Sequence, residues 1–279
     1  MTTTSPAVGD DRRARLVVLT DLLGPVFGTE NICFFLYSLI RMQRPQCVVE
    51  LGAGLGVSSL WMAEGARQNR CGHVWTLDDF GVWAADGSLL GTVCAGLTRA
   101  GYGPIQAATP DEYFDRLATG IGVEDVLSVI PTHMDLTDVH HFDRYPFLAE
   151  QPVDLLFSDF MHGPIDILAI LGQFLPRMAP ASSIFIDSAS TVWSSYLLLE
   201  TLVTQLNAGK IPKALQDRCT SDLQSVMYGR RIVLVHLTEA VSRRQNSTAW
   251  LKIEPIDLVA QPRSSTVDFA EAPAPPQGA

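Results

Sequence analysis

The chain has 279 residues, of which 47% are hydrophobic and 18% are charged. This length and apolar content allow one large α/β domain with additions, and they argue against disorder over most of the chain. The formal net charge of −10 at pH 7 works against non-specific binding to nucleic acid or to an anionic membrane.

Apolar runs and cysteines indicate the compartment. No window approaches the roughly 18 consecutive apolar residues of a transmembrane helix, and residues 1–15 lack the apolar centre of a signal peptide. The five cysteines form no C-x-x-C pair, which is typical of thiols in a reducing compartment. We therefore expect a cytoplasmic protein without a membrane-spanning segment.

Two helices are predicted ahead of the first strand, so residues 1–44 are expected to form an N-terminal helical cap. Residues 11–23 have apolar side chains at helical spacing, and Gly24-Pro25 is expected to end that helix. Thr29 is a suitable N-cap for a second helix with an apolar body over residues 32–40. Because residues 32–40 are apolar on more than one face, this helix is a candidate for homodimer contact.

A buried strand followed by a glycine-rich loop comes next. Val48 and Val49 are β-formers, and Glu50 stands at the end of the predicted strand. The glycines that follow at every second position are Gly52, Gly54 and Gly56. They tolerate positive φ and lack the Cβ atoms that would keep a ligand away from the backbone. Helical spacing over residues 58–68 places a helix N-terminus with free N–H groups directly after the loop.

The spacing of this loop differs from that of a dinucleotide site. The dinucleotide fingerprint is G-x-G-x-x-G, whereas Val57 here occupies the place of the third glycine. Glu50 would repel a pyrophosphate and suits a ligand that carries an amine. The segment Glu50-Leu51-Gly52-Ala53-Gly54-Leu55-Gly56 resembles the first motif of class I S-adenosylmethionine (SAM) dependent methyltransferases. The resemblance implies that this loop, together with Ser58, holds the methionine part of SAM, and that the N-terminal helices cover a substrate.

Two further acids are candidates for cofactor contact. Asp78 follows a predicted strand over residues 73–77 and lies 22 residues beyond Gly56, where a carboxylate can accept hydrogen bonds from both hydroxyls of a ribose. The spacing favours this interpretation over an exposed turn aspartate. Asp135 follows a predicted strand over residues 126–130 and loosely matches the family position near the adenine, although a plain loop carboxylate is an equally good interpretation.

The second half of the chain continues the alternation of strands and helices. Strands are predicted over residues 153–158 and 183–186, helices over 165–175 and 191–207, and a terminal hairpin over 223–227 and 232–237. The pattern predicts a Rossmann-like doubly wound α/β sheet of about seven strands, mostly parallel with a terminal antiparallel hairpin and with helices on both faces. Residues 45–240 form this predicted domain, and residues 241–279 are expected to be an extended or flexible tail.

Parallel strands bring their carboxyl ends to one edge of a sheet, so the acids at strand ends are expected to gather there. Besides Glu50 and Asp78 these are Asp159 and Asp187. Asp159-Phe160-Met161-His162 is similar to the D-x-x-H stretch of catechol-type and related small-molecule O-methyltransferases. The resemblance implies a catalytic role for Asp159 and His162, with His162 as a general base and Asp159 also near the cofactor. A structural loop histidine is the alternative for His162.

The same resemblance makes a bound divalent metal ion possible but does not favour it. Catechol-type enzymes hold the ion with the acid after the fourth strand and an Asp-Asn pair after the fifth, and here Ser188 stands in the place of the Asn. Two carboxylates and a hydroxyl remain as ligands for Mg²⁺. The spacing of His133, His140 and His141 is typical of a solvated loop, so no metal site is predicted.

The function predicted from the sequence is SAM-dependent methyl transfer to a small-molecule acceptor in a biosynthetic pathway. The sequence leaves open whether the accepting atom is oxygen, nitrogen or carbon. A SAM-fold scaffold without catalysis is the alternative from another class, and the intact glycine loop speaks against it. A nicotinamide-dependent oxidoreductase is disfavoured by Glu50 and by the glycine spacing.

Overall fold

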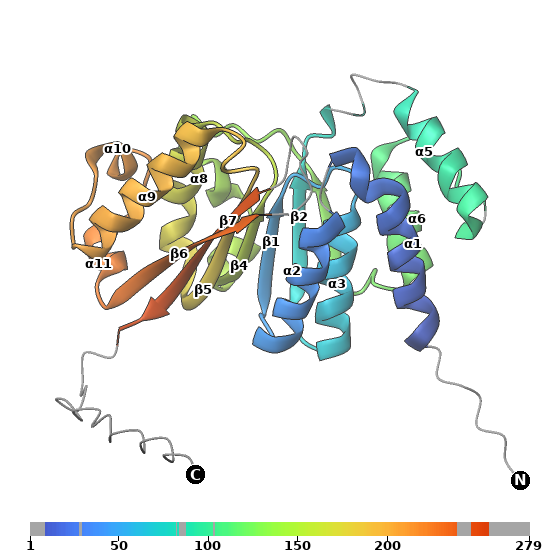
Figure 1. Cartoon of the computed structure of the whole chain (residues 1–279), viewed down its shortest axis with the longest axis horizontal. Helices are drawn as coiled ribbons and strands as arrows, with labels where there is room; N and C mark the ends of the chain where they lie inside the picture. The colour runs from blue at the N-terminus through green and yellow to red at the C-terminus, as the bar shows by residue number, and fades with distance from the viewer. Residues whose placement is uncertain are drawn as a thin grey trace, which may run out of the picture.

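The computed structural model describes residues 9–27, 30–81, 83, 88–102, 104–238 and 247–256. Seven strands form one sheet in the order β3-β2-β1-β4-β5-β7-β6 (Figure 1). They are β1 (Cys47–Leu51), β2 (His73–Asp78), β3 (Leu127–Pro131), β4 (Val153–Ser158), β5 (Met178–Asp187), β6 (Arg230–Thr238) and β7 (Ser247–Pro255). The pairs among β1 to β5 are parallel, whereas β7 runs antiparallel to both β5 and β6. The predicted doubly wound, mostly parallel fold is confirmed.

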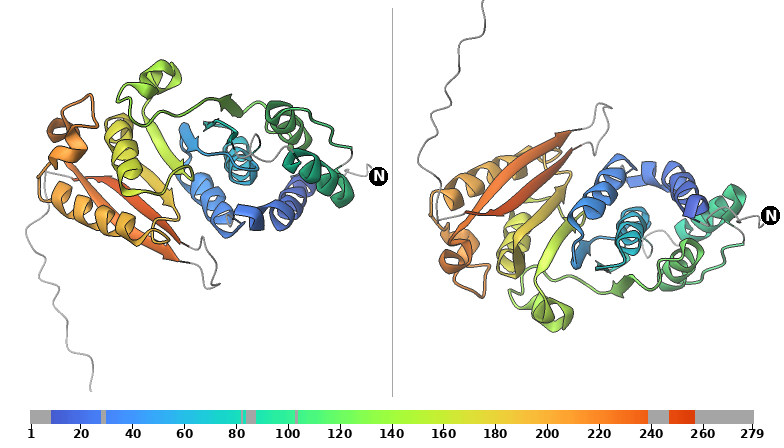
Figure 2. Two further views of the ribbon diagram at one scale, coloured as in Figure 1. Left: turned by 90° about the horizontal axis from the view of Figure 1, so that it is seen from above. Right: turned by 90° about the horizontal axis from the view of Figure 1, so that it is seen from below.

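Helices cover both faces of the twisted sheet (Figure 2). One core contains side chains of α1 (Gly9–Phe27), α2 (Glu30–Gln43), α3 (Val57–Asn69), α5 (Leu89–Leu97) and α6 (Pro110–Ile121). The other contains side chains of α7 (Phe147–Glu150), α8 (Pro164–Phe174), α9 (Trp193–Asn207), α10 (Lys213–Gln216) and α11 (Leu223–Met227). Shorter helical turns are η1 (Thr98–Tyr102), η2 (His141–Arg144) and η3 (Leu175–Arg177). Because successive strand residues face opposite sides, Val48 lies in the first core and Val49 in the second.

The two N-terminal helices pack onto α3 and share its core. The indole nitrogen of Trp61 in α3 donates a hydrogen bond of 2.7 Å to the Thr20 hydroxyl in α1, and the side chain of Asn69 donates to the Ile40 carbonyl in α2 at 2.7 Å. The expected break at Gly24-Pro25 is wrong, because α1 continues to Phe27. Pro25 removes one backbone N–H donor from the last turns of α1, and the helix ends two residues after it.

The apolar faces of α2 are used inside the chain. Ile32, Leu36 and Ile40 are buried, whereas Phe34 and Met42 remain exposed. The homodimer predicted through residues 32–40 therefore stays a prediction with a smaller apolar surface than the sequence suggests. Among the described residues, no helix is long and apolar enough to cross a membrane.

The terminal hairpin exists, and its strand predicted over residues 232–237 lies within β6, whereas the strand predicted over residues 223–227 is wrong. Residues 223–227 form the helix α11, whose N-cap Asp222 accepts hydrogen bonds from the Gln224 N–H at 3.1 Å and the Ser225 hydroxyl at 2.7 Å. The partner of β6 is β7, which lies within the predicted tail of residues 241–279. In β7 the buried Ala249, Leu251 and Ile253 alternate with less buried neighbours, which is the period of a strand. Residues 239–246 and 257–279 lie outside the described part of the chain.

Candidate functional site

The four acids predicted to gather at the carboxyl edge of the parallel strands do so. Glu50 lies in β1 and Asp78 ends β2, while Asp159 follows β4 and Asp187 ends β5. Since β1 pairs with both β2 and β4, and β4 pairs with β5, these acids stand on adjacent strands. Burial, followed by the negative charges of Asp187 and Glu50, raises the pKa of Asp159 well above its ordinary value.

The glycine loop between β1 and α3 is shaped by its neighbours in the protein. Gly52 has φ of +90°, and a Cβ there would lie 2.8 Å from the carbonyl carbon of Asp159. Gly56 has φ of +82°, and a Cβ there would lie 2.5 Å from the ring of Phe114. Any side chain at either position would be strained and would collide. These two glycines are therefore required for close packing of the loop against β4 and α6, a reason that sequence analysis did not give.

Glu50 stands in β1 just before the loop, and its side chain is completely buried. The hydroxyls of Ser58 and Ser59 each donate to one of its carboxylate oxygens, and the Thr76 hydroxyl donates at 2.7 Å. Burial raises its pKa to about 7, although these three hydrogen bonds act in the opposite direction. In this arrangement the Glu50 carboxylate joins β1 to the first turn of α3 and to β2. The predicted contact of Glu50 and Ser58 with the cofactor stays a prediction.

Asp78 links the loop to the end of β2. Its Oδ2 accepts hydrogen bonds from the N–H groups of Ala53 at 2.6 Å and Gly54 at 3.1 Å, and its Oδ1 accepts from the Phe80 N–H at 2.6 Å. Burial raises the pKa of Asp78, and the backbone hydrogen bonds offset part of that effect. The acid predicted from its spacing thus lies directly against the glycine loop.

Asp159 and His162 stand on the other side of the loop, next to Asp187. The Nδ1 of His162 lies 3.1 Å from the Asp187 carbonyl oxygen, and its Nε2 lies 3.9 Å from Oδ1 of Asp159. A carbonyl oxygen can only accept, so Nδ1 must carry the hydrogen of the neutral ring and Nε2 keeps a lone pair. The Ser195 hydroxyl donates to the His162 carbonyl at 2.5 Å, which ties this loop to α9.

Each carboxylate oxygen of Asp187 accepts a hydrogen bond from a hydroxyl group. Thr248 of β7 donates to Oδ1 and Ser188 donates to Oδ2, both at 2.8 Å. Burial raises the pKa of Asp187, and these hydrogen bonds lower it in part. Each carboxylate oxygen of Asp187 accepts one hydrogen bond, which leaves a further lone pair on both oxygens. Within the described ranges, no cluster of three His, Cys, Asp or Glu side chains could hold a metal.

Asp135 is not joined to this cluster by any hydrogen bond described for it. Its Oδ1 accepts hydrogen bonds from the Thr137 N–H at 2.9 Å and the Thr137 hydroxyl at 2.6 Å, and its side chain is exposed. Hydrogen bonding to Thr137 lowers its pKa. This geometry favours the loop-carboxylate interpretation that the sequence left open.

Several residues of the site carry no motif in the sequence. Ser59 and Thr76 complete the shell around Glu50, and Thr248 reaches Asp187 from β7. Ser59 is directly beside a predicted cofactor residue, so its position was a usable signal. Thr248 could not be predicted, because residues 241–279 have the composition of a tail. Only the pairing of β5 with β7 brings Thr248 next to Asp187.

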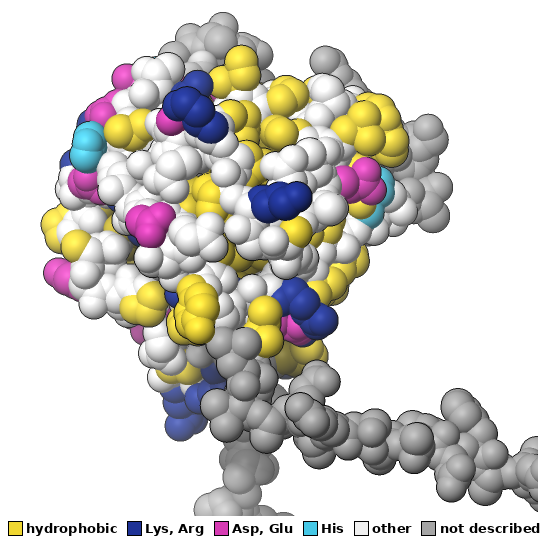
Figure 3. All heavy atoms as spheres, turned by 90° about the vertical axis from the view of Figure 1, so that its left-hand side faces the viewer, with side chains coloured by type: hydrophobic (Ala, Val, Ile, Leu, Met, Phe, Trp, Pro, Cys, Tyr) yellow, Lys and Arg dark blue, Asp and Glu magenta, His cyan; other side chains and the backbone are white. Residues whose placement is uncertain are grey.

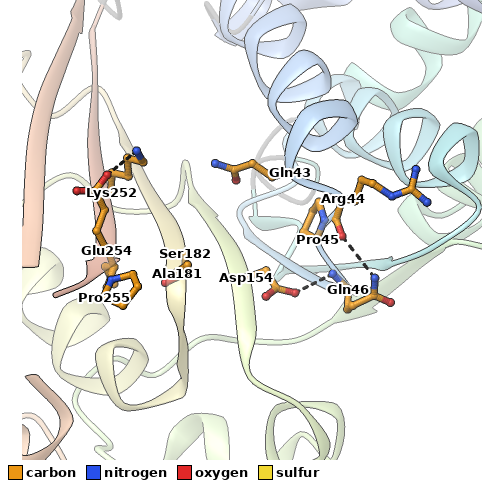
Figure 4. Close-up of a pocket in the computed structure, with 11 residues that line it drawn as sticks. Gln43, Arg44, Pro45, Gln46, Asp154, Ala181, Ser182, Lys252, Glu254 and Pro255 are labelled. Atoms are coloured by element: carbon orange, nitrogen blue, oxygen red, sulfur yellow. Dashed lines mark hydrogen bonds and ion pairs between the residues drawn. The ribbon is translucent and has the colours of Figure 1, made fainter. Parts of the chain in front are cut away.

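A groove of about 570 Å³ lies at the opposite edge of the sheet, between α2 and the end of β7 (Figure 4). Asp154 accepts hydrogen bonds there from the N–H groups of Gln46 and Cys47 at 2.7 and 3.0 Å. Lys252 pairs with Glu254 at 2.6 Å. Because these charged groups have partners within the chain and the clustered acids stand at the other edge, the groove is not the candidate active site.

The chain is similar to known methyltransferases. A family model described as a methyltransferase domain matches residues 49–189. Similar solved structures include an O-methyltransferase from Bacillus cereus in complex with S-adenosylhomocysteine (SAH), with 13% identity, 86% of this chain and 91% of that chain covered, and a TM-score of 0.49. The O-methyltransferase TomG from Streptomyces achromogenes, involved in tomaymycin synthesis and in complex with SAM, shares 15% identity over 81% of this chain and 80% of that chain, with a TM-score of 0.43. A methyltransferase from Geobacter sulfurreducens shares 14% identity over 90% and 93% of the two chains, with a TM-score of 0.45. No curated protein matches the chain in sequence.

The match to the family model covers half of the chain. It starts in β1 and ends two residues after β5, so it spans the glycine loop, Asp78, Asp159, His162 and Asp187. The chain therefore belongs to the methyltransferase domain family.

Proposed function

We propose that the protein is a SAM-dependent methyltransferase that acts on a small-molecule acceptor. The observation that carries the proposal is the contact between the glycine loop and Asp78, within a chain of the methyltransferase domain family. Two of the similar solved structures contain SAM or SAH, and the loop of this chain has the spacing of the family's first motif.

The residues proposed to hold SAM surround the loop. The loop backbone from Gly52 to Gly56 would receive the methionine part, and Asp78 would accept hydrogen bonds from the ribose hydroxyls. Glu50 and Ser58 are also proposed to contact the cofactor, and their hydrogen bond joins β1 to α3 on the two sides of the loop. The backbone of Asp159 lies against Gly52, and we propose that its carboxylate contacts the cofactor as well.

SAM supplies a methyl group on a positively charged sulfur, which an acceptor nucleophile attacks in line. The protein has to align the acceptor and exclude water, and a base is needed where the acceptor carries a proton at working pH. We propose His162 for that role, because its Nε2 keeps a lone pair while Nδ1–H donates to the Asp187 carbonyl. The acceptor proton would move to Nε2, which lies 3.9 Å from Oδ1 of Asp159.

A small acceptor agrees with the charge of the protein. Figure 3 views the side formed by α9, α10 and α11, where the visible Lys and Arg side chains are separated by uncharged surface and do not form a continuous basic face. The net charge is −10, which disfavours nucleic acid as the acceptor. All five cysteines are free thiols, which supports the proposed cytoplasmic location. A biosynthetic role and a homodimer remain parts of the proposal.

Calorimetric titration with SAH tests the proposal. We expect binding in the micromolar range for the wild-type protein, and loss of binding for Gly54→Arg, which would fill the loop with a long side chain. NADH serves as the control ligand and should give no heat of binding. Binding of NADH without SAH would favour an oxidoreductase. A folded protein that binds neither ligand would refute the proposal and favour a scaffold.

A further inference from the structure

The helix α6 is fixed at both ends. Its N-cap Thr109 accepts a hydrogen bond from the Glu112 N–H at 3.3 Å, and the Glu112 carboxylate accepts one from the Ala108 N–H at 2.8 Å. Pro110 occupies the first turn, and Gly122 ends the helix with φ of +75°. Two defined caps make α6 a firm support for the side chains that it presents to the core.

Two consecutive aromatic residues of α6 contact the glycine loop. The Tyr113 hydroxyl donates a hydrogen bond of 3.1 Å to the Leu55 carbonyl, and the ring of Phe114 closes the space where a Cβ of Gly56 would be. Both side chains are almost completely buried, at 0% and 1% exposed. The second half of the loop is therefore held against α6 by one hydrogen bond and one close ring contact.

The same two residues contact the segment that follows Asp78. The ring of Phe80 lies 5.5 Å from that of Phe114, and the ring of Trp83 lies 5.0 Å from that of Tyr113. Phe80 has φ of +54° and donates its N–H to Asp78 at 2.6 Å. Such a backbone conformation is unfavourable for phenylalanine, so the surrounding contacts must hold it.

We propose that Tyr113 is a positioning residue for the cofactor, with Phe114 as its support. From one helix, the pair joins the two parts of the site that are proposed to bind SAM, namely the glycine loop and the Asp78 segment. The expected effect on SAM binding rests on the proposed function. The contacts of Tyr113 and Phe114 with the loop, called the clamp below, are present in the protein without a ligand. A loop whose Leu55 carbonyl has lost the hydrogen bond from Tyr113 would spend less time in the conformation that binds SAM. The apparent affinity for SAM would fall in proportion to the population of that conformation.

The test compares two variants that each lose one phenolic hydroxyl. Tyr113→Phe keeps the ring packed and removes the hydrogen bond to Leu55. Tyr37→Phe is the matched control, because its hydroxyl donates to Gln68 at 2.8 Å between α2 and α3. For each protein we would measure the SAH dissociation constant by calorimetry, the Tm, and the amide hydrogen exchange of residues 53–56 without ligand.

We expect Tyr113→Phe to weaken SAH binding about 3- to 10-fold, which is the loss of one hydrogen bond, and to speed exchange at residues 53–56. Tyr37→Phe should keep both values within about 2-fold of the wild type at a comparable Tm. Unchanged affinity and unchanged loop exchange in Tyr113→Phe would overturn the inference, as would an equal loss in both variants. If the wild type binds no SAH, the proposed function fails, and loop exchange alone decides the clamp.

Discussion

Replacing Glu50 by glutamine tests how the titration of this buried carboxyl changes the stability of the protein. Glu50 is completely buried among the hydroxyls of Ser58, Ser59 and Thr76, and burial raises its pKa from 4.5 to about 7. Between these two values the native state holds a proton that the unfolded chain has lost, so the free energy of unfolding falls as the pH rises. Stabilisation by the protonated carboxyl is complete below pH 4.5 and is lost as the pH passes about 7.

The size of this effect follows from the two pKa values. Each pH unit between them changes the free energy of unfolding by about 1.4 kcal/mol, so the contribution of Glu50 falls by about 2 to 3 kcal/mol from pH 5 to pH 8. Glu50→Gln removes this titration while its amide can still pair with the three hydroxyls, which can accept as well as donate. Asp78, Asp159 and Asp187 remain in both proteins, but the variant also removes the Glu50 charge that raises the pKa of Asp159. The difference between the proteins therefore measures Glu50 together with its coupling to the neighbouring acids.

Urea denaturation of both proteins at pH 5, 6, 7 and 8 measures the difference. We expect wild-type stability to fall with pH more steeply than that of Glu50→Gln, by about 2 to 3 kcal/mol over the range. Parallel curves would refute the assignment of a raised pKa to Glu50. A wild-type protein that gains stability relative to the variant as the pH rises would refute the direction of the shift.

Three further predictions follow from the packing. Gly52→Ala should abolish SAH binding in calorimetry, because the new Cβ collides with the backbone of Asp159 at a residue with φ of +90°; binding at wild-type affinity would contradict this. His162→Gln should leave SAH binding within about 2-fold and slow methyl transfer to the wild-type acceptor at least about 100-fold; a radioactive methyl-transfer assay that finds equal rates would exclude His162 as the base. Trp61→Phe should lower the free energy of unfolding by about 1 kcal/mol, because Thr20 loses a buried hydrogen bond at 2.7 Å; an unchanged urea midpoint would refute the contribution of that bond.

The sequence predicted the parallel part of the fold because its signals are local. The apolar strand ahead of the glycine loop, the acid at each strand end and the helix caps all act over a few residues, and the structure has the acids at one edge as expected. One strand of the last hairpin was misplaced because short apolar segments are ambiguous. Leu223, Val226 and Met227 have the spacing of one helix face, and Asp222 caps the helix that they form.

The sequence identified several residues of the candidate site, but it did not show which contacts they make. Glu50 and Asp78 were identified from their positions, yet only packing shows that Glu50 is enclosed by three hydroxyls and that Asp78 accepts from the loop. Tyr113 and Thr248 lie on α6 and β7, far along the chain from Leu55 and Asp187. Contacts of this kind depend on how elements pack, and no local spacing in the sequence indicates them.

A crystal structure of the protein with SAH bound would test the central claim most directly. We predict SAH at the carboxyl edge of the parallel strands, with its ribose hydroxyls on Asp78 and its methionine part on the Gly52–Gly56 backbone. Its sulfur is expected on the side of the site that contains His162. SAH bound elsewhere, for example in the groove between Gln43 and Lys252 at the opposite edge, would contradict it.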